Sequence, residues 1–393
     1  MELIENNMRA ELSQRWDRMR ENMIQAGADG CLLNIDVNLY YTTGRVFNGY
    51  FYLPADGEPW FFVKRPNGLT GENVEYIRKP EQIPDILRSK GAKLPKNLML
   101  EGDEITYNDY MRLLTAFGLG KAGNATALMR KIKTVKTLWE IAQFRQSAER
   151  HAAAYSHIKG CFRKGMTDVE FQYEIERVMR ENGSLGIFRA FGSNMDIFVG
   201  SLLAGDNAGA PSPFDFALGG GGMHPSAPIG ANGTALKNGM SVMIDMGGTF
   251  TPYITDMTRV FSVGELTDLA YRAHEVSREI ERETEKISKP GTACCDIYNL
   301  AVEIAGQHSL HKYFMGTEQQ AKFVGHGIGL QINELPVLTP RSKEVLEEGM
   351  VFALEPKFVI PGVGAVGNEN SFVVTASGIE KLTRFEEGIT KLD

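Results

Sequence analysis

Two aspartates in neighbouring apolar segments are the first residues of this sequence that could carry chemistry. The segment 242–248 is hydrophobic, contains Asp245 and ends in a pair of glycines, and the next apolar segment, after Pro252, carries Asp256. This pattern predicts two adjacent strands. Because burial of an unpaired carboxylate is costly, two such aspartates need a positive partner. A metal ion and an ion pair with Arg259 both remain open as that partner.

Three further polar residues lie in or beside apolar segments nearer the C-terminus. His326 stands between glycines, Glu355 ends an apolar run, and Glu369 begins another. Taken singly, the histidine could be a buried residue bonded to a carbonyl, and each glutamate a solvated strand end. Taken with the aspartates, four carboxylates in one core need compensating positive charge.

Two divalent metal ions that share bridging carboxylates would supply this charge, and such a pair is a known device for activating water. One histidine among oxygen ligands suits Mn²⁺, Co²⁺, Zn²⁺ or Fe²⁺ and does not choose among them. The glycine run at 219–222 precedes His224 but lacks the Gly-Lys-Ser/Thr ending of a phosphate-binding loop.

The elements that must position these residues belong to the second of two predicted domains, residues 1–134 and 135–393. The first domain reads as a small α/β unit without clustered ligands. Its expected helices are 12–26, 81–89 and 108–117, and its expected strands are 31–35, 50–53, 60–63 and 98–100, with an Asp-Gly hairpin at 55–59.

In the second domain, helical patterns occur in pairs, and strands follow each pair. One pair starts after Lys136, and its second helix has capping-box spacing between Thr167 and Glu170. The other pair starts at Thr267 and continues over 296–308. The sequence therefore predicts an α+β catalytic domain built from two diverged ααβ halves.

Composition restricts the class of protein. The chain has 393 residues, 43% hydrophobic and 23% charged, with a net charge of −7. These values are typical of a soluble globular enzyme and exclude nucleic acid or an anionic membrane as partner. The N-terminus lacks the pattern of a secretory signal, and no apolar run reaches spanning length. Four cysteines without a CxxC pair indicate reduced thiols and a cytoplasmic location.

The ordered set of these residues resembles the pita-bread metallopeptidase superfamily, which includes aminopeptidase P, prolidase, methionine aminopeptidase and the metal-free creatinase. The matching segments are Asp245, Asp256-Met257-Thr258-Arg259, Gly325-His326-Gly327-Ile328-Gly329, Ala353-Leu354-Glu355-Pro356 and Glu369-Asn370. The segment 38–44 resembles the creatinase-type N-terminal domain of the Xaa-Pro aminopeptidase and prolidase branch. The resemblance implies a creatinase-like N-terminal domain followed by a pita-bread catalytic domain.

The resemblance also implies roles for individual residues. Asp245 would bind one metal ion with both oxygens, and Asp256 would bridge the two ions. His326 and Glu355 would complete the other metal site, and Glu369 would bridge both. A hydroxide between the ions would attack the scissile carbonyl, and Glu355 would move its proton to the leaving nitrogen. His224 would contact the substrate. A homodimer is implied because many relatives are dimers.

Three positions depart from the proline-specific members of the family. Lys322 and Asn333 stand where those members have histidines, and Gly367 stands where they have an arginine. Asn333 can still donate a hydrogen bond to a developing oxyanion, but it cannot carry a proton. The changes alter the surroundings of the substrate and leave the metal ligands intact.

These observations favour a dinuclear metallohydrolase of the Xaa-Pro aminopeptidase or dipeptidase type, acting on a short peptide or small amide. A metal-dependent amidase or lyase with a small non-peptide substrate is the first alternative, because one fold hosts different reactions. A binding homologue without activity is the second alternative. The five intact ligands argue against it.

Overall fold

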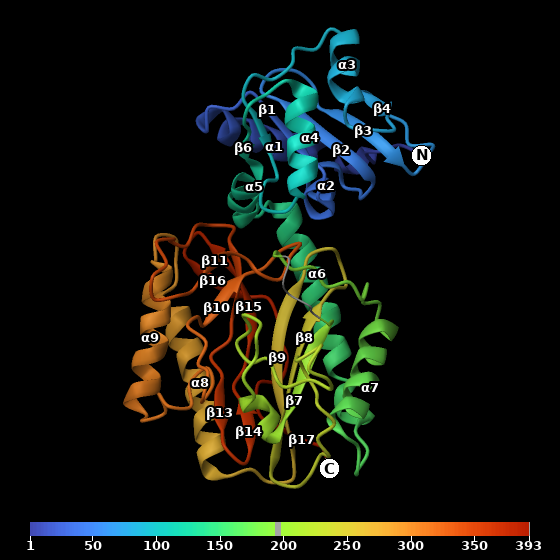
Figure 1. Cartoon of the computed structure of the whole chain (residues 1–393). Helices are drawn as coiled ribbons and strands as arrows, with labels where there is room; N and C mark the ends of the chain where they lie inside the picture. Colours follow the sequence, from blue (N-terminus) through green and yellow to red (C-terminus); the bar gives the residue numbers. More distant parts are fainter. Residues whose placement is uncertain (193–197, 393) are drawn as a thin grey trace. The chain divides into compact units, whose positions relative to one another are not determined.

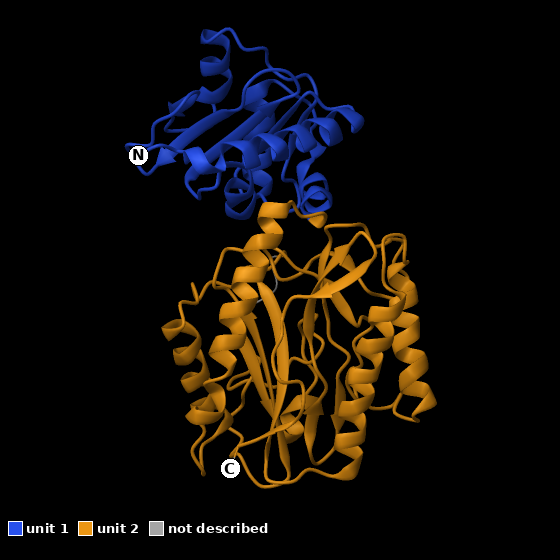
Figure 2. Cartoon of the chain, turned by 180° about the vertical axis from the view of Figure 1, so that it is seen from behind, with its two compact units in different colours: residues 1–133 blue, residues 134–393 orange. Residues whose placement is uncertain are grey.

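The computed structural model describes residues 1–192 and 198–392, and the chain divides into two compact units, residues 1–133 and 134–393 (Figure 2). This division falls one residue before the boundary expected from the sequence. Residues 193–197 and 393 fall within the expected catalytic domain and lie outside the described residues.

The N-terminal unit is a mixed sheet flanked by helices. Its strand order is β4-β3-β2-β1-β5-β6, and the aromatic hairpin predicted from the Asp-Gly turn is the antiparallel pair β2–β3, with Tyr52 opposite Trp60. The strands are β1 (Gly30–Leu33), β2 (Asn48–Pro54), β3 (Trp60–Arg65), β4 (Val74–Tyr76), β5 (Leu98–Leu100) and β6 (Gly123–Asn124).

The helices of this unit are α1 (Arg9–Gln25), α2 (Asp36–Thr43), α3 (Gln82–Ser89), α4 (Tyr107–Phe117) and α5 (Ala125–Thr134), after a 3₁₀ turn at Asn6–Met8. The three helices expected from the sequence are present, each within a few residues of its predicted bounds.

Helix α2 was not expected. It ends at Gly44, whose φ of 70° is the left-handed conformation that glycine adopts readily at a helix C-terminus.

The C-terminal unit contains the two predicted helix pairs. These are α6 (Leu138–Tyr155) with α7 (Asp168–Glu181), and α8 (Asp268–Ile287) with α9 (Cys294–Gln307). The capping box predicted for Thr167 and Glu170 is present, and Thr137 with Glu140 forms another at the start of α6. The two pairs lie on opposite sides of the strands (Figure 1).

Strands β7–β17 form three sheets between these helix pairs. The four-stranded sheet has the order β17-β9-β8-β7 and the five-stranded sheet the order β11-β10-β12-β15-β16, while β13 pairs with β14. Their bounds are β7 (Gly200–Ala204), β8 (Met240–Gly248), β9 (Thr255–Val263), β10 (Gly325–Gly327), β11 (Glu334–Val337), β12 (Val351–Leu354), β13 (Phe358–Ile360), β14 (Gly364–Val366), β15 (Asn370–Thr375), β16 (Gly378–Lys381) and β17 (Thr390–Lys391); 3₁₀ turns lie at Ile158–Cys161 and Gly205–Gly209.

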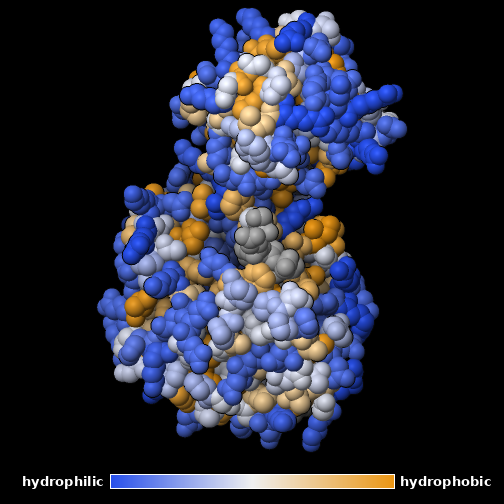
Figure 3. Space-filling model, viewed as in Figure 1, coloured by the Kyte–Doolittle hydropathy of each residue, from blue (hydrophilic) through white to orange (hydrophobic). Residues whose placement is uncertain are grey.

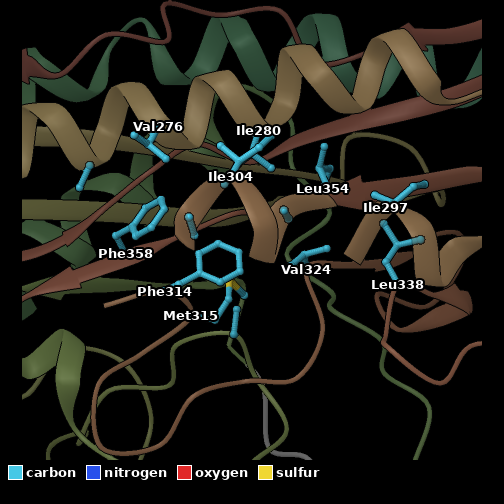
Figure 4. Close-up of a cluster of buried hydrophobic side chains, with 14 of the residues drawn as sticks. Val276, Ile280, Ile297, Ile304, Phe314, Met315, Val324, Leu338, Leu354 and Phe358 are labelled. Atoms are coloured by element: carbon cyan, nitrogen blue, oxygen red, sulfur yellow. The ribbon is translucent and has the colours of Figure 1, made fainter. Parts of the chain in front are cut away.

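A large hydrophobic cluster anchors the strands that lead to the predicted ligands. Val276 and Ile280 of α8 and Ile304 of α9 pack with Leu354 and Phe358 from the strands (Figure 4). Because side chains alternate along an extended chain, burial of Leu354 in this cluster turns the next residue, Glu355, away from it. The cluster thereby fixes the end of β12 at which that glutamate stands.

The surface in Figure 3 is mainly hydrophilic, with hydrophobic residues in small scattered groups. Such a distribution is ordinary for a globular protein and does not by itself indicate an interaction site. Among the described residues, no helix combines the length and apolar character needed to cross a membrane.

Candidate metal centre

The pairing of β8 with β9 places two predicted ligands on one face of the four-stranded sheet. In this register Asp245 lies opposite Thr258, and Gly247 lies opposite Asp256. Residues two apart on a strand point to the same face, so all four positions face the same way. A Cβ atom on Gly247 would lie 2.0 Å from the Phe188 ring, so this glycine leaves room for that ring beside the sheet.

The other three predicted ligands come from the five-stranded sheet. His326 on β10 lies opposite Ala353 on β12, and Glu355 follows the end of β12. Leu354 lies opposite Asn370, so Glu369, immediately before Asn370, is at the same end of the sheet.

The two sheets meet at this point through backbone and side-chain hydrogen bonds. The Glu369 amide donates to the Thr258 carbonyl at 3.3 Å, and the Asp256 amide donates to Ser371 Oγ at 2.9 Å. The five predicted ligands, from distant parts of the chain, are thereby brought together. Their donor atoms form two groups within 4.8 Å, Asp256 with His326 and Glu369, and Asp245 with Glu355 and Glu369.

The second of these groups holds a lysine that sequence reasoning did not identify. Lys357 Nζ donates to Asp245 Oδ2 at 2.8 Å, to Glu355 Oε2 at 2.7 Å and to Glu369 Oε2 at 2.9 Å. The side chain of Lys357 is 0% exposed. The sequence does contain a signal for this residue, because Lys357 stands next to the apolar run 358–360 that follows Glu355. A lysine buried in such a run needs anionic partners, and the nearby carboxylates are the candidates.

Electrostatics in this cluster are dominated by burial and by mutual repulsion of the carboxylates. Burial lowers the pKa of Lys357, but the negative charges of its three partners outweigh that effect and hold its pKa well above the usual value. Burial, followed by the charges of Glu369, Asp245 and Glu355, raises the pKa of Asp256 well above its usual value. The positive charge of Lys357 offsets this rise only in part, because its ion pairs are with Asp245, Glu355 and Glu369.

The residues of the first group fit a divalent metal ion. Glu369 Oε1 is buried and has no hydrogen-bond partner among the described residues. His326 Nδ1 lies 3.2 Å from the Gly327 carbonyl, which can only accept, so Nε2 is left as the free ligand atom. That atom is 3.5 Å from Glu355 Oε1 and 3.8 Å from Asp256 Oδ2. Imidazole and carboxylate donors of this kind suit Mn²⁺, Fe²⁺, Co²⁺ or Zn²⁺.

Thr258 and Arg259 support the predicted metal ligand Glu369 without being ligands themselves. The Thr258 hydroxyl donates to Glu369 Oε2 at 2.7 Å. The Arg259 guanidinium donates to the Thr258 and Glu369 carbonyls and to Asn370 Oδ1. Arg259 thus holds the backbone that carries Glu369 and does not pair with the carboxylates of Asp245 or Asp256.

A cavity of about 100 Å³ opens onto this centre. Its polar end is formed by the five predicted ligands, and its walls are mainly apolar. The apolar side chains are Phe188, Phe216, Ala217, Leu218, Ile229, Phe323 and Ile332.

Asn333 lines the cavity, whereas His224 is absent from the described residues that line it. The Asn333 amide is bonded to the backbone of Phe191: Oδ1 accepts from the amide at 2.6 Å and Nδ2 donates to the carbonyl at 2.8 Å. His224 is exposed and lies 2.8 Å from the Ser226 hydroxyl. The structure therefore brings Asn333 to the site as a support for the chain near Phe191, and it does not bring His224 there.

The other two departures from the family pattern also have a structural setting. Lys322 is exposed. Gly367 has a φ of 126°, and a Cβ atom there would lie 2.5 Å from the Pro356 carbonyl. An arginine at this position would require the adjoining backbone to move, so the glycine is a requirement of the local backbone.

Comparisons with known proteins agree with this geometry. Residues 142–376 match the family model of metallopeptidase family M24, and residues 15–135 match that of the creatinase/prolidase N-terminal domain. The chain therefore belongs to metallopeptidase family M24. It is an enzyme of the metallopeptidase class, with a creatinase-type N-terminal domain.

Relatives span nearly the whole chain. An uncharacterized peptidase of Staphylococcus aureus (strain USA300) is 25% identical over 92% of this chain and 96% of its own length. The Xaa-Pro dipeptidase from Bacillus anthracis is 25% identical, with a TM-score of 0.77 over 97% of this chain and 99% of the other. The prolidase from Pyrococcus horikoshii OT3, 21% identical, shares the fold with a TM-score of 0.76 over 95% and 99%.

Proposed function

We propose that this metallopeptidase hydrolyses the Xaa-Pro bond of short peptides, as an aminopeptidase or dipeptidase, with a divalent ion held by Asp256, His326, Glu355 and Glu369. The observation that carries this proposal is a pair of ligand atoms at a cavity with mainly apolar walls: the unpartnered Glu369 Oε1, and His326 Nε2, which faces Glu355 and Asp256. The solved relatives named as an Xaa-Pro dipeptidase and a prolidase support the choice of substrate.

The chemistry follows from the arrangement of the chain's own residues. A divalent ion at this position supplies Lewis-acid polarisation of the scissile carbonyl. Glu355 is placed to take a proton from the attacking water and to deliver it to the leaving nitrogen. Phe188, Phe216 and Phe323 offer an apolar wall against which a pyrrolidine ring can pack.

Two ions were expected from the sequence, but the second would share Asp245, Glu355 and Glu369 with the Lys357 ammonium. We therefore build the proposal on the Asp256 side alone. The four cysteines are free thiols, three of them buried, which supports a reducing, cytoplasmic location. A homodimer and the use of manganese remain expectations from the family resemblance.

A peptide panel tests the proposal. Purified protein loaded with Mn²⁺ is offered Xaa-Pro dipeptides and tripeptides beside matched Xaa-Ala peptides, and release of the N-terminal residue is measured. We expect cleavage of the Xaa-Pro members and loss of at least 100-fold in kcat/KM for Glu355→Gln, in line with removal of a general base.

Two results would contradict this function in different ways. Metal binding without cleavage of any peptide would move the reaction to a non-peptide amide or a lyase substrate. Equal cleavage of the Xaa-Ala peptides would keep the peptidase and remove the proline selectivity.

A further inference from the structure

We propose that the Lys357 ammonium takes the place of one of two metal ions, so that the centre binds a single divalent ion per chain. This inference rests on the proposed function to the extent that it requires a metal on the Asp256 side. It differs from the two-ion expectation because it assigns the Asp245 side to a side chain of the protein itself.

The first observation is that every donor of the ammonium is satisfied within the cluster. A lysine ammonium has three N–H bonds, and Nζ has three carboxylate acceptors, Asp245, Glu355 and Glu369, at 2.7–2.9 Å. These are the same three residues that form the second of the two metal-competent groups. A metal ion in that group would compete with Lys357 for these three carboxylates.

The second observation is the charge of the whole cluster. Asp245, Asp256, Glu355 and Glu369 carry four negative charges when ionised. The ammonium neutralises one and a single divalent ion two, which leaves one negative charge. A second divalent ion would leave one positive charge instead, and it would lie beside a buried ammonium, where like charges repel strongly.

The third observation is that the lysine is held in place by the fold. Glu355 and Lys357 are two residues apart in the connection from β12 to β13, so both side chains can point to the same side. The Met315 amide donates to the Lys357 carbonyl at 2.8 Å, and Phe358, the next residue, is fully buried in the core around Phe314. Withdrawal of the lysine would leave three buried carboxylates without their cation.

The buried carboxylate oxygen without a partner among the described residues belongs to Glu369, which is shared by the two groups. Glu369 directs Oε2 to Lys357 and Thr258, whereas Oε1 has no partner among the described residues. Glu369 therefore bridges a lysine and a metal position, where the resemblance implied a bridge between two metal ions. Asp245, predicted to be a metal ligand, serves as a partner of Lys357.

Metal stoichiometry tests this assignment directly. Metal-free full-length protein is titrated with Mn²⁺ by calorimetry, and the bound metal is measured by elemental analysis. Electron paramagnetic resonance then shows whether the bound Mn²⁺ is an isolated ion or one of an exchange-coupled pair. We expect one Mn²⁺ per wild-type chain and the spectrum of an isolated ion. Two ions per chain, or an exchange-coupled pair, would overturn the inference and leave the proposed function standing.

Variants separate the role of the lysine from that of the carboxylates. Lys357→Gly removes the ammonium and is expected to raise the stoichiometry to two ions per chain, with a coupled spectrum. Asp245→Asn is expected to keep one ion, whereas a two-ion centre would lose metal with it. A Lys357→Gly protein that still binds one ion would contradict the inference.

The stoichiometry and spectrum of the wild-type protein decide between one ion and two even if a variant fails to fold.

His326→Ala is the control for the other side of the cluster and is expected to lose the single ion. If the wild-type protein binds no metal at all, both the proposed function and this inference fail. If it binds two ions and cleaves Xaa-Pro peptides, only this inference fails.

Discussion

Thr258 donates its hydroxyl hydrogen to Glu369 Oε2 at 2.7 Å, and the Glu369 amide donates back to the Thr258 carbonyl at 3.3 Å. This reciprocal pair joins the β9 strand of one sheet to the start of β15 in the other. It also fixes the carboxylate that turns one oxygen to Lys357 and leaves the other for a metal ion. The geometry of the centre therefore depends on a residue that is not itself a ligand.

Replacement of Thr258 by valine tests this dependence. The two side chains have nearly the same shape, so Thr258→Val removes the hydroxyl donor with little change in packing. Loss of a hydrogen bond to a metal ligand typically costs 10-fold to 100-fold in metal affinity. We expect the Mn²⁺ Kd to rise by about 10-fold, measured by calorimetry. Thr375→Val, whose hydroxyl donates to the Gly378 carbonyl at the far end of β15, is the matched control and should leave the Kd unchanged.

Asp256 is expected to lower the stability of the metal-free protein while it provides metal binding. Burial, followed by the charges of Glu369, Asp245 and Glu355, raises its pKa, so ionisation at pH 8 opposes folding. We expect metal-free Asp256→Asn to be more stable than metal-free wild type by on the order of 1–2 kcal/mol. Mn²⁺ should raise the Tm of the wild-type protein and not that of the variant. A metal-free variant less stable than wild type would show that the carboxylate contributes favourably to folding.

Asn333 is predicted to act through the chain segment that it holds. Its side-chain amide bonds to the backbone amide and to the carbonyl of Phe191, and Phe188, three residues earlier, forms part of the cavity wall. Asn333→Ala should loosen this segment, raise KM for Xaa-Pro peptides several-fold and increase proteolytic cleavage near 185–192. Asn182→Ala, at the end of α7 and outside the cavity, is the control and should leave KM unchanged. If KM is unchanged while kcat falls, Asn333 acts on the reacting atoms and not on the segment.

Asn333→His tests the departure from the family pattern separately. If the missing histidine limits turnover of proline peptides, this change should raise kcat. The amide contacts to Phe191 would be lost at the same time, so the expected outcome is a higher kcat together with a higher KM. An unchanged kcat would show that this position does not limit the reaction.

His151 predicts a loss of stability in acid. Burial, followed by the positive charge of Arg259, lowers its pKa from 6.5 to about 3. Its folded pKa lies below its unfolded value, so the contribution to stability is present above pH 6.5 and is lost as the pH falls towards 3. At pH 5 the expected loss is about 2 kcal/mol.

Urea unfolding at pH 7.5 and pH 5.0 measures this loss. Wild type should lose more stability between the two pH values than His151→Phe, because phenylalanine fills the same aromatic environment beside Tyr155 and Phe250 without a titrating group. His157 is exposed, so the control His157→Gln should lose as much stability between the two pH values as wild type. Equal losses in wild type and His151→Phe would contradict the assignment.

Much of this protein is determined by local sequence. The capping residues Thr137, Thr167 and Thr267 set the starts of three helices, because a hydroxyl there satisfies a backbone amide that the helix leaves unbonded. The apolar runs before Glu355 and around Asp245 predicted strands for the same local reason. Helix α2 escaped prediction because its residues, Asn38 to Tyr41 among them, have weak helical preference and are held by tertiary contacts such as that of Asn38 with Glu101.

The residue types and order of Asp245, Asp256, His326, Glu355 and Glu369 determined the family and the carboxylate-rich centre, because a buried cluster of this composition requires a cation. Only the tertiary structure showed that the Lys357 ammonium is one cation of this centre. The register of β8 with β9 and the turn from β12 to β13 bring Lys357 Nζ to three carboxylates. The contact of Lys357 with Asp245, which is 112 positions away in the chain, depends on how the two sheets meet, and no local pattern in the sequence predicts it.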